Sequence, residues 1–539
     1  MNTSTWKKKL NFGHSSPTKE TILLFKKEIP ISYIVFLLLI IGVFVRIWQL
    51  GIVPGGINQD EAFSGYEAYS LLHYGIDSSG YTFPVYLTTW GSGMNALNSY
   101  LMIPFMALFG AHTWVVRLPQ VLVACFSLLV FYKLLKKLVH AKAALIGLFL
   151  LTICPWHIMM ARWGLESNLA PGFLLFGLYF FILGIENTKY FLLSALFYGL
   201  SLYCYATIWP IVPLIILLQT AYLIFTKKIQ PSIDLLISAL ILIVFAMPLL
   251  CFLLVNNGYM EEIRTAFLSI PKMPAIRSSE ISFSNIPENF KNLWTIISNE
   301  NDNLYWNSTS EYGLYHKGVL FFGIVGFAYC IKDLIRSIRT RSFESSVFIL
   351  IQFLTSVLLG CLIDVNVNRI NCIHLSILLL GALGLTNLMR LLKTDFRFVS
   401  FVVFIVYSIL FLSFEKFYFS TYNENISIMF QDGLEESIDY AMNLSEQTGR
   451  ETIYVSPEFI YSKVLFYSRL SAEEYTNTVE YSNYPSAYMN INSAGPFVFN
   501  FSTYSPDGIY IISADSSASY ESAGYTVEQF KNTAVAYYN

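Results

Sequence analysis

Long apolar runs alternate with short polar segments along most of the chain. A helix that crosses a bilayer needs roughly 20 mostly apolar residues, and about eleven runs approach or reach that length. The runs are residues 31–50, 115–139, 143–160, 169–185, 191–207, 211–225, 233–255, 319–335, 347–363, 370–392 and 398–414. One further run, 97–109, is short and contains Pro104, so it predicts a re-entrant or interfacial helix. The pattern predicts an all-α polytopic membrane protein.

Composition agrees with this class of protein. The chain is 55% hydrophobic and 13% charged, whereas a soluble domain carries about 25% charged residues. Its partner is therefore a lipid bilayer, and a net charge of −2 indicates no nucleic-acid partner. The seven cysteines show no pairing pattern and lie in or beside apolar runs, as buried small hydrophobic residues do.

Basic residues predict the orientation, because loops rich in Lys and Arg stay on the cytoplasmic side. The first cluster places the N-terminus inside: Lys7, Lys8, Lys9, Lys26 and Lys27. With eleven spans, every later cluster falls on the same side: Lys133, Lys136, Lys137 and Lys142; Lys189; Lys227 and Lys228; Lys332, Arg336, Arg339 and Arg341; Arg390, Lys393 and Arg397. Counting 97–109 as a span would place the later clusters outside, so the charges support leaving it out.

The chain divides into three parts on this topology. We expect a cytoplasmic segment at 1–30, a transmembrane domain at 31–414 and an extracytoplasmic domain at 415–539. The outer face collects the loops 51–114 and 256–318, in which 260–268 and 289–297 have helix-like patterns. The tail predicts a small α/β unit with a helix near 431–446 and strands at 452–456, 497–501 and 508–513. No Gly-rich nucleotide-binding loop is present in the sequence.

The first outer loop carries two adjacent acids, Asp60 and Glu61, directly after the turn Pro54-Gly55-Gly56. A lone carboxylate costs about 2.5 to 3.5 kcal/mol at the bilayer centre, so the pair belongs at the membrane surface or in a polar cavity. Two interpretations stay open. One acid is a general base that takes the proton of a hydroxyl nucleophile, beside a neighbour that tunes it or caps the next helix. Alternatively, both acids stabilise a helix N-terminus.

An ordered series of short motifs surrounds this pair. The motifs are Arg46 to Gly51 (RIWQLG), Asp60-Glu61-Ala62 with Gly65 and Ala68, Phe83 to Tyr86 (FPVY), Trp90-Gly91, Phe109-Gly110, Arg117-Leu118-Pro119, Pro155-Trp156-His157, and Ala161 to Glu166 (ARWGLE). The series resembles the protein O-mannosyltransferase and aminoarabinose-transferase superfamily of membrane glycosyltransferases, the glycosyltransferase family 39-like proteins of the GT-C fold type. The resemblance covers residues 40–210 well and the later spans loosely.

The resemblance implies a donor and roles for the acids. In that family an Asp of the first loop acts as the base toward the acceptor, and the donor is a sugar on a polyprenyl phosphate. Asp60 is then the base and Glu61 its neighbour. Glu166 matches a recurrent family acid that helps to form the acceptor or donor pocket; its other interpretation is a residue that starts a helix.

Departure of a polyprenyl phosphate develops negative charge, which Arg or Lys donors neutralise. The outer-face candidates are Arg46, Arg117, Arg162, Lys317 and Arg369. Arg369 is the best placed, in a very short turn that also carries Asn368, and relatives have an Arg in a comparable late turn that contacts the donor phosphate. A helix anchor that snorkels to the interface is its other interpretation. We interpret Arg46 and Arg117 as interface anchors.

Three further candidates stand at helix ends. His316 and Lys317 open a span where relatives have a Gly-Tyr-rich entry, so they are candidates for the donor phosphate or, alternatively, interfacial residues. His157, beside Trp156, either packs on a sugar or belongs to a structural Trp-His pair. Some relatives hold a metal ion through a Glu after the acidic motif, but residues 89–95 contain no carboxylate, so we expect no cofactor, with a divalent metal ion as the open alternative.

The sequence predicts a multi-pass glycosyltransferase of the cell membrane with its site on the extracytoplasmic face. It would move a sugar from a polyprenyl-phosphate donor to a hydroxyl of a cell-envelope acceptor, and direct attack would invert the anomeric configuration. Two alternatives remain. A transporter or flippase of lipid-linked sugars would place charges deep within spans and break helices in matched halves. A relative without catalytic activity would serve as a scaffold.

Overall fold

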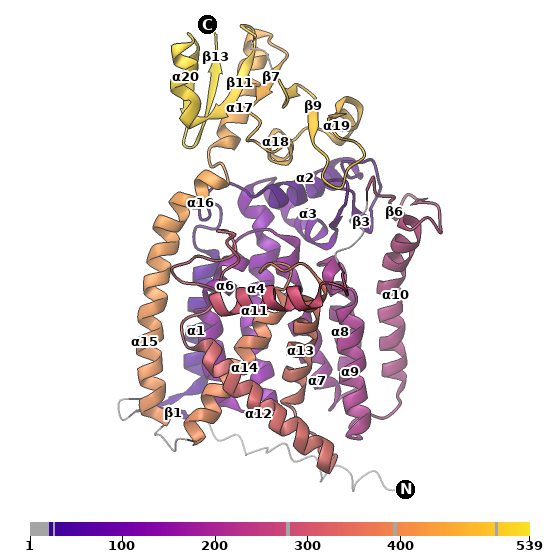
Figure 1. Cartoon of the computed structure of the whole chain (residues 1–539), viewed down its shortest axis with the longest axis vertical. Coiled ribbons are helices and arrows are strands. Elements are labelled where there is room, and N and C mark those ends of the chain that lie inside the picture. Colours follow the sequence, from indigo (N-terminus) through magenta and orange to yellow (C-terminus); the bar gives the residue numbers. More distant parts are fainter. Residues whose placement is uncertain (1–20, 25–26, 276–280, 392–395, 502–504, 539) are drawn as a thin grey trace.

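The computed structural model describes residues 21–24, 27–275, 281–391, 396–501 and 505–538. It consists of a bundle of long helices and a smaller unit with a β-sheet at one end (Figure 1). Of the basic residues that predict orientation, Lys7, Lys8, Lys9, Lys26 and Lys393 lie outside the described residues. The two short strands β1 (Thr21–Leu24) and β2 (Lys27–Pro30) precede the first helix.

Six helical segments in the described part of the chain are long and apolar enough to cross a membrane. They are Thr113–Leu138 (α4), Glu166–Gly184 (η1 and α7), Ala206–Phe225 (η2 and α9), Ile233–Asn256 (α10), Cys372–Leu391 (α14) and Phe401–Met429 (α15 to α16). Shorter apolar helices accompany them: Ile31–Ile47 (α1), Leu97–Phe109 (α3), Tyr190–Ser201 (α8) and Val347–Leu362 (α13). Together with α12 (Val319–Thr340), they form the body of a multi-pass membrane protein.

One predicted span is broken. The apolar run 143–160 forms two helices, Ala141–Thr152 (α5) and Pro155–Ala161 (α6), which are bent by 59°. Pro155 is the first residue of α6, where its missing N–H costs nothing, whereas inside a continuous helix it would remove a hydrogen bond. The break gives α6 its own direction at the end of the bundle that faces the C-terminal unit.

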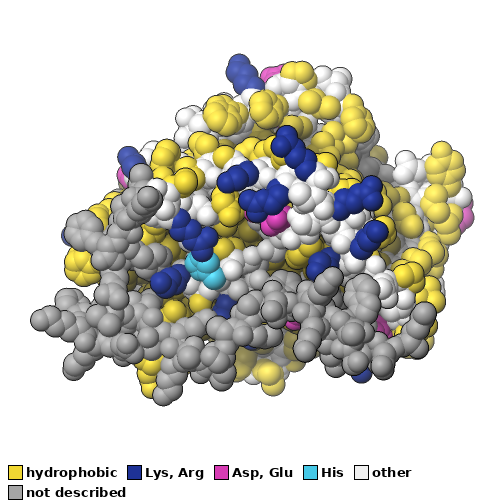
Figure 2. Space-filling view, turned by 90° about the horizontal axis from the view of Figure 1, so that it is seen from below, with side chains coloured by type: hydrophobic (Ala, Val, Ile, Leu, Met, Phe, Trp, Pro, Cys, Tyr) yellow, Lys and Arg dark blue, Asp and Glu magenta, His cyan; other side chains and the backbone are white. Residues whose placement is uncertain are grey.

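The basic clusters gather at the end of the bundle away from the β-sheet unit. Figure 2 shows Lys and Arg side chains grouped on this face. Lys137 at the end of α4 pairs with Glu186 at 2.6 Å, Lys228 lies over the Phe343 ring, and Arg341 lies over the Phe225 ring. The loops that the sequence placed on one side therefore meet in space.

The first outer loop folds over the opposite end of the bundle. It contains α2 (Gln59–Tyr74), the hairpin strands β3 (Tyr86–Leu87) and β4 (Met94–Asn95), and α3. The loop 256–318 contains α11 (Ile286–Asn299), which agrees with the helix predicted there. The helix expected at 260–268 is wrong: β5 (Ile263–Arg264) and β6 (Ser269–Ile270) form a hairpin, because the Thr265 hydroxyl accepts from the N–H groups at the turn.

The C-terminal unit is built on a seven-stranded sheet with the order β12-β13-β11-β7-β10-β9-β8. Its strands are β7 (Ile453–Val455), β8 (Glu480–Tyr481), β9 (Ile491–Ala494), β10 (Phe497–Val498), β11 (Ile509–Ser513), β12 (Thr526–Phe530) and β13 (Thr533–Tyr537). Its helices are α17 (Leu434–Thr448), α18 (Tyr461–Ser468), α19 (Ala472–Thr478) and α20 (Ser517–Ser522). The small α/β unit expected from the sequence is confirmed.

This unit and the first outer loop share one hydrophobic core. Helix α18 packs on α2, and the rings of Phe63, Trp90 and Tyr461 form a cluster with centroids 5.0 to 5.6 Å apart. The chain reaches the unit through α15 (Phe396–Phe417), a π-helical turn (Tyr418–Tyr422) and α16 (Asn423–Met429). The shared core fixes the C-terminal unit against the first outer loop.

Candidate active site

The acidic pair lies at the N-terminus of α2. Asn58 is the N-cap: its Oδ1 accepts from Asp60 N at 2.9 Å, and its own N–H donates to Glu61 Oε2 at 2.9 Å, which is the reciprocal arrangement of a capping box. Asp60 is half-buried and accepts at Oδ1 from Trp90 Nε1 at 3.1 Å. The cap fixes the backbone of the first turn, so the direction of the Asp60 side chain is set by the fold.

Glu61 points away from Asp60 into the protein. Its carboxylate is fully buried and pairs with Arg117 Nε at 3.0 Å, and it also accepts from the Gly164 N–H. Arg117 in turn donates to the carbonyls of Pro54 and Gly56 at 2.8 and 2.7 Å. The buried pair thus holds the turn before α2 in place, because a buried charge is tolerated only where it is paired and hydrogen-bonded.

A cavity of about 320 Å³ lies beside Asp60, within the size range of small-molecule sites. Six segments far apart in sequence form its wall: the start of α2, the turn after α6, the loop after α11, the turn before α14, the end of α16 with the residues after it, and the segment that leads from β7 into α18. The lining residues are Asn58, Gln59, Asp60, Trp163, Leu304, Trp306, Asn366, Asn368, Met429, Phe430, Gln431, Glu458, Ile460 and Lys463.

The lining combines aromatic rings with amides. Trp163 and Trp306 each lie with their ring centroid 6.5 Å from that of Phe430, so three rings flank one side of the cavity. Side-chain amides on several segments, such as Asn58 and Asn368, supply both donors and acceptors. Flat apolar surfaces next to amide groups match the two faces of a sugar ring, whose C–H groups are apolar and whose hydroxyls need hydrogen-bond partners.

The C-terminal unit adds a buried lysine. Lys463 of α18 is 4% exposed, and its Nζ donates to Gln431 Oε1 at 2.9 Å and to Phe430 O at 3.3 Å. Burial lowers the pKa of Lys463 to about 7, which the nearby Glu61 charge partly opposes. Gln431 has φ +59°, a conformation that costs a non-glycine residue of order 1–3 kcal/mol and that is concentrated at functional sites.

The fold and one stretch of sequence match known proteins. The family model described as dolichyl-phosphate-mannose-protein mannosyltransferase matches residues 96–252. The crystal structure of ArnT from Cupriavidus metallidurans bound to undecaprenyl phosphate matches with a TM-score of 0.52 at 11% identity, covering 93% of this chain and 97% of that chain. Its apo form gives a TM-score of 0.52 at 12% identity, covering 94% and 98%. No curated protein matches the chain by sequence.

The chain has the GT-C fold seen in ArnT. As in the expectation from the motifs, the GT-C fold of this protein joins a helical membrane body to a small C-terminal unit. Two of the predicted site residues, Asp60 and Asn368, meet in the cavity. Glu61 does not line it; its contacts are those of a residue that positions the start of α2.

Arg162 and His157 make structural contacts in this GT-C protein. The buried Arg162 guanidinium donates to the carbonyls of Val45, Trp48 and Val53, so it closes the C-terminus of α1. His157 is also buried, and its Nδ1 accepts from Arg46 Nε at 3.1 Å. Arg46 and Arg117 are fully buried, and the interpretation of both as interface anchors is therefore wrong.

The remaining predicted residues lie outside the cavity. Glu166 accepts from the Asn95 N–H beside the β3–β4 hairpin. The Arg369 side chain donates to Asp364 O at 3.0 Å and lies 3.6 Å from its carboxylate. His316 is buried, its Nε2 bonds to Ile153 O at 2.8 Å, and burial lowers its pKa to about 4. Lys317 is exposed. These side chains are not among the residues that line the cavity.

A metal ion would need a different set of donors. Within the described ranges no three His, Cys, Asp or Glu side chains gather closely enough to hold one. The hairpin at 89–95, where some relatives offer a carboxylate, contains none. The described residues therefore do not fit a metal site with three such ligands, and the proposed chemistry rests on side chains alone.

Sequence reasoning missed the cavity residues that come from distant segments. Trp163 follows Arg162 in the quoted motif, but its role as a wall of the cavity depends on the bend between α5 and α6. Gln431, Glu458 and Lys463 belong to the C-terminal tail, whose composition does not indicate a catalytic or binding site. The one available signal was Lys463 itself, because it is the single charged residue in the otherwise mostly apolar run IYSKVLF of the tail.

Proposed function

We propose that this GT-C protein transfers a sugar from a polyprenyl-phosphate donor to a hydroxyl of a cell-envelope acceptor. The observation that carries the proposal is the position of Asp60, which stands in the wall of a cavity lined by tryptophans and amides. The ArnT structure of the same fold contains undecaprenyl phosphate, which supports a lipid-linked donor here.

Asp60 acts as the general base in this proposal. Its carboxylate takes the proton of the acceptor hydroxyl while the oxygen attacks the anomeric carbon, and the bond from that carbon to the phosphate oxygen breaks. The electron pair of that bond stays on the phosphate. One displacement of this kind inverts the anomeric configuration. The hydrogen bond from Trp90 Nε1 orients the carboxylate toward the cavity.

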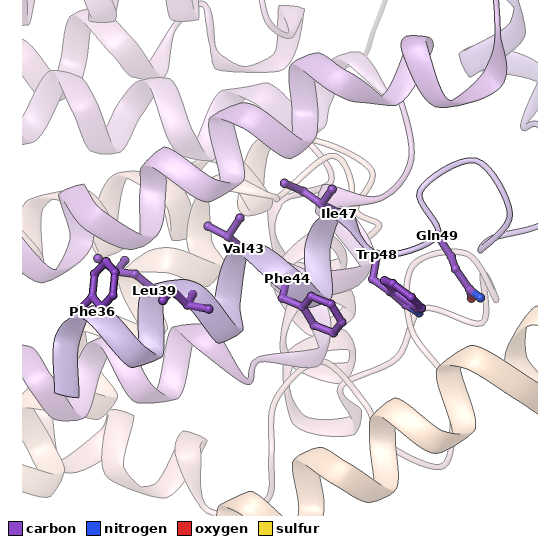
Figure 3. Close-up of a pocket in the computed structure, with 8 residues that line it drawn as sticks. Phe36, Leu39, Val43, Phe44, Ile47, Trp48 and Gln49 are labelled. Carbon is purple, nitrogen blue, oxygen red and sulfur yellow. The ribbon is translucent and has the colours of Figure 1, made fainter. Parts of the chain in front are cut away.

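The lipid tail of the donor has a candidate place on α1. A groove of about 600 Å³ runs along this helix and is lined by Phe36, Leu39, Ile40, Val43, Phe44, Ile47, Trp48 and Gln49, as Figure 3 shows. Arg162 links groove and cavity, because it donates to Trp48 O and its chain neighbour Trp163 lines the cavity.

The cavity faces the outside of the cell in this proposal. Basic clusters lie at the end of the bundle opposite to the C-terminal unit, and such clusters stay in the cytoplasm. The cavity and the C-terminal unit then lie on the extracytoplasmic face, where the envelope acceptor is.

The test uses purified full-length protein in lipid nanodiscs, an undecaprenyl-phosphate-linked sugar and an envelope extract. Loss of a general base costs typically 10²- to 10⁴-fold, so Asp60→Asn should lower the rate of glycosidic product formation by at least about 100-fold. Asp364→Asn is the matched control, because this carboxylate is 87% exposed on an outer turn and outside the cavity.

Equal rates for Asp60→Asn and wild type would rule out Asp60 as the base. Movement of the lipid-linked sugar across vesicles without any glycosidic product would instead support a flippase. The melting temperature of each variant is measured beside the rate, so that a loss of fold is not mistaken for a loss of chemistry.

A further inference from the structure

The cavity contains a single Lys or Arg among the described residues that line it, and this residue comes from the C-terminal unit. Lys463 reaches the wall from α18. The arginine candidates for the donor phosphate make other contacts. Arg369 donates to Asp364 O, Arg162 donates to carbonyls at the end of α1, and Arg117 pairs with Glu61 and donates to loop carbonyls. The positive charge available to a ligand in this cavity is therefore that of Lys463.

No carboxylate of the described residues is in hydrogen-bond or ion-pair contact with Lys463, although the Glu61 charge acts on it and Asp60 and Glu458 line the same cavity. In the described part of the chain the hydrogen-bond acceptors of Lys463 are a backbone carbonyl and an amide oxygen, those of Phe430 and Gln431. An ammonium carries three N–H donors, so a third donor remains for a ligand. Burying an ammonium costs several kcal/mol unless an anion compensates it, and neither acceptor is an anion.

The acceptor groups around Lys463 are themselves held in place. Gln431 has a positive φ, and its Nε2 donates to Glu458 O at 2.8 Å. Ser462, the neighbour of Lys463, donates from Oγ to Gln59 O at 3.0 Å, which ties the start of α18 to the start of α2. The lysine therefore stands at a fixed position relative to Asp60, as an electrostatic contribution to a reaction requires.

We propose that Lys463 is the cation that binds the phosphate of the lipid-linked donor, so that the C-terminal unit completes the active site. The inference rests on the proposed function. When the bond between the anomeric carbon and the phosphate oxygen breaks, that oxygen gains negative charge, and an N–H of Lys463 donates to it. The acceptor proton passes to Asp60, so the step leaves a polyprenyl phosphate with one more negative charge and a neutral carboxyl.

Binding of undecaprenyl phosphate without a sugar tests Lys463 separately from the reaction. The variants are Lys463→Met and Lys463→Gln, which remove the charge, Lys463→Arg, which keeps it, and Lys531→Met, a control on the same unit whose side chain is 57% exposed. A hydrogen bond to a charged group contributes enough for a roughly 10- to 100-fold change in affinity. We expect that loss in the Met and Gln variants and not in Lys463→Arg or Lys531→Met.

Uncharged undecaprenol supplies the second readout, because its binding should be the same in all variants. The melting temperature supplies the third. Removal of a buried charge that has no anion in contact leaves the free protein as stable as wild type or more stable, so Lys463→Met should lose phosphate binding without losing stability. The Gln variant keeps N–H donors for Phe430 O and provides a folded protein if the Met variant does not fold.

Undecaprenyl phosphate binding by a folded Lys463→Met or Lys463→Gln protein at wild-type affinity would overturn the inference. A melting temperature that falls together with a loss of undecaprenol binding would assign Lys463 a structural role and would overturn it as well. Failure of the wild type to form glycosidic product from any donor would remove the proposed function, yet the binding result would still decide whether Lys463 holds a phosphate.

Discussion

Two glutamates six residues apart on α2 are both fully buried, and the protein accommodates them in opposite ways. Glu61 faces the Arg117 guanidinium and accepts from two backbone N–H groups, those of Asn58 and Gly164. Glu67 faces another acid, Asp77, and accepts from the Ser78 hydroxyl and N–H. Burial raises the pKa of Glu67, and the charge of Asp77 raises it further. One helix therefore carries two kinds of buried acid. Glu61, next to the cavity, is compensated by the Arg117 cation. Glu67, which does not line the cavity, has a raised pKa that favours its protonated form.

Removal of the charge at Glu61 should have the largest effect on stability. Glu61→Gln leaves Arg117 as a buried cation without its partner, and breaking a buried pair costs about 3–5 kcal/mol. Chemical denaturation in detergent measures the loss. The control is Glu435→Gln, whose pair with Arg469 is partly exposed at 4.0 Å and should contribute at most about 1 kcal/mol. Equal stability of Glu61→Gln and wild type would mean that the pair does not hold the turn before α2.

The buried acids Glu67 and Asp77 should make the stability of the protein depend on pH. An acid whose pKa is raised by folding favours the folded state while it is protonated. The contribution is therefore complete below the ordinary Glu pKa of about 4.3 and is lost as the pH rises through the raised value. Burial also raises the pKa of Asp77, to about 6, against the opposing effects of the backbone N–H groups of Tyr81 and Ser79 and of the Arg264 charge.

Glu67→Gln should remove most of this dependence. The amide has no charge to bury, so the variant should melt above wild type at pH 9, and the difference should shrink toward pH 5. Melting temperatures across this range measure it, with Glu61→Gln as the comparison, since its deficit should persist at pH 9. A melting curve of Glu67→Gln that follows wild type at every pH would show that Glu67 is charged throughout.

The smallest expected effect concerns the donor to Glu67. Ser78→Ala removes one hydroxyl at 2.5 Å from Oε1 and keeps the backbone N–H, so the cost should be about 1 kcal/mol, as for a typical hydrogen bond. The cost should grow with pH, because a hydrogen bond to a charged carboxylate is stronger than one to a neutral carboxyl. A cost that is the same at pH 5 and pH 9 would contradict a protonation change at Glu67.

The sequence predicted the features that depend on local pattern. Apolar length defined the helical body, and the basic loops that face each other at one end were found from charge alone. Asn58 followed three residues later by Glu61 is the pattern of a capping box, which is why one of the two open interpretations of the acidic pair holds for Glu61. The role of Asp60 as a base stays a prediction.

What the sequence did not predict depends on which distant segments meet. The positions of Arg46, Arg117 and Arg162 indicate only that each stands near a helix end; the carbonyls that surround them come from other turns. Residues 260–268 form a hairpin and not the expected helix, because the Thr265 hydroxyl accepts a hydrogen bond from the Leu268 N–H and stabilises the turn. Lys463 reaches the cavity only through packing of α18 on α2, which no local pattern encodes.

The core shared by α2 and α18 also sets an order of events during synthesis. Gln59 and Ser462, which are joined across this core, lie 403 residues apart in the chain. At 5–20 residues per second, the first outer loop leaves the ribosome about 20–80 s before the helix that covers it. The apolar face of α2, next to Asp60, therefore stays uncovered during the time in which the membrane helices insert. The cavity closes as one of the last steps of assembly, and a chain that stops before α18 has no complete site.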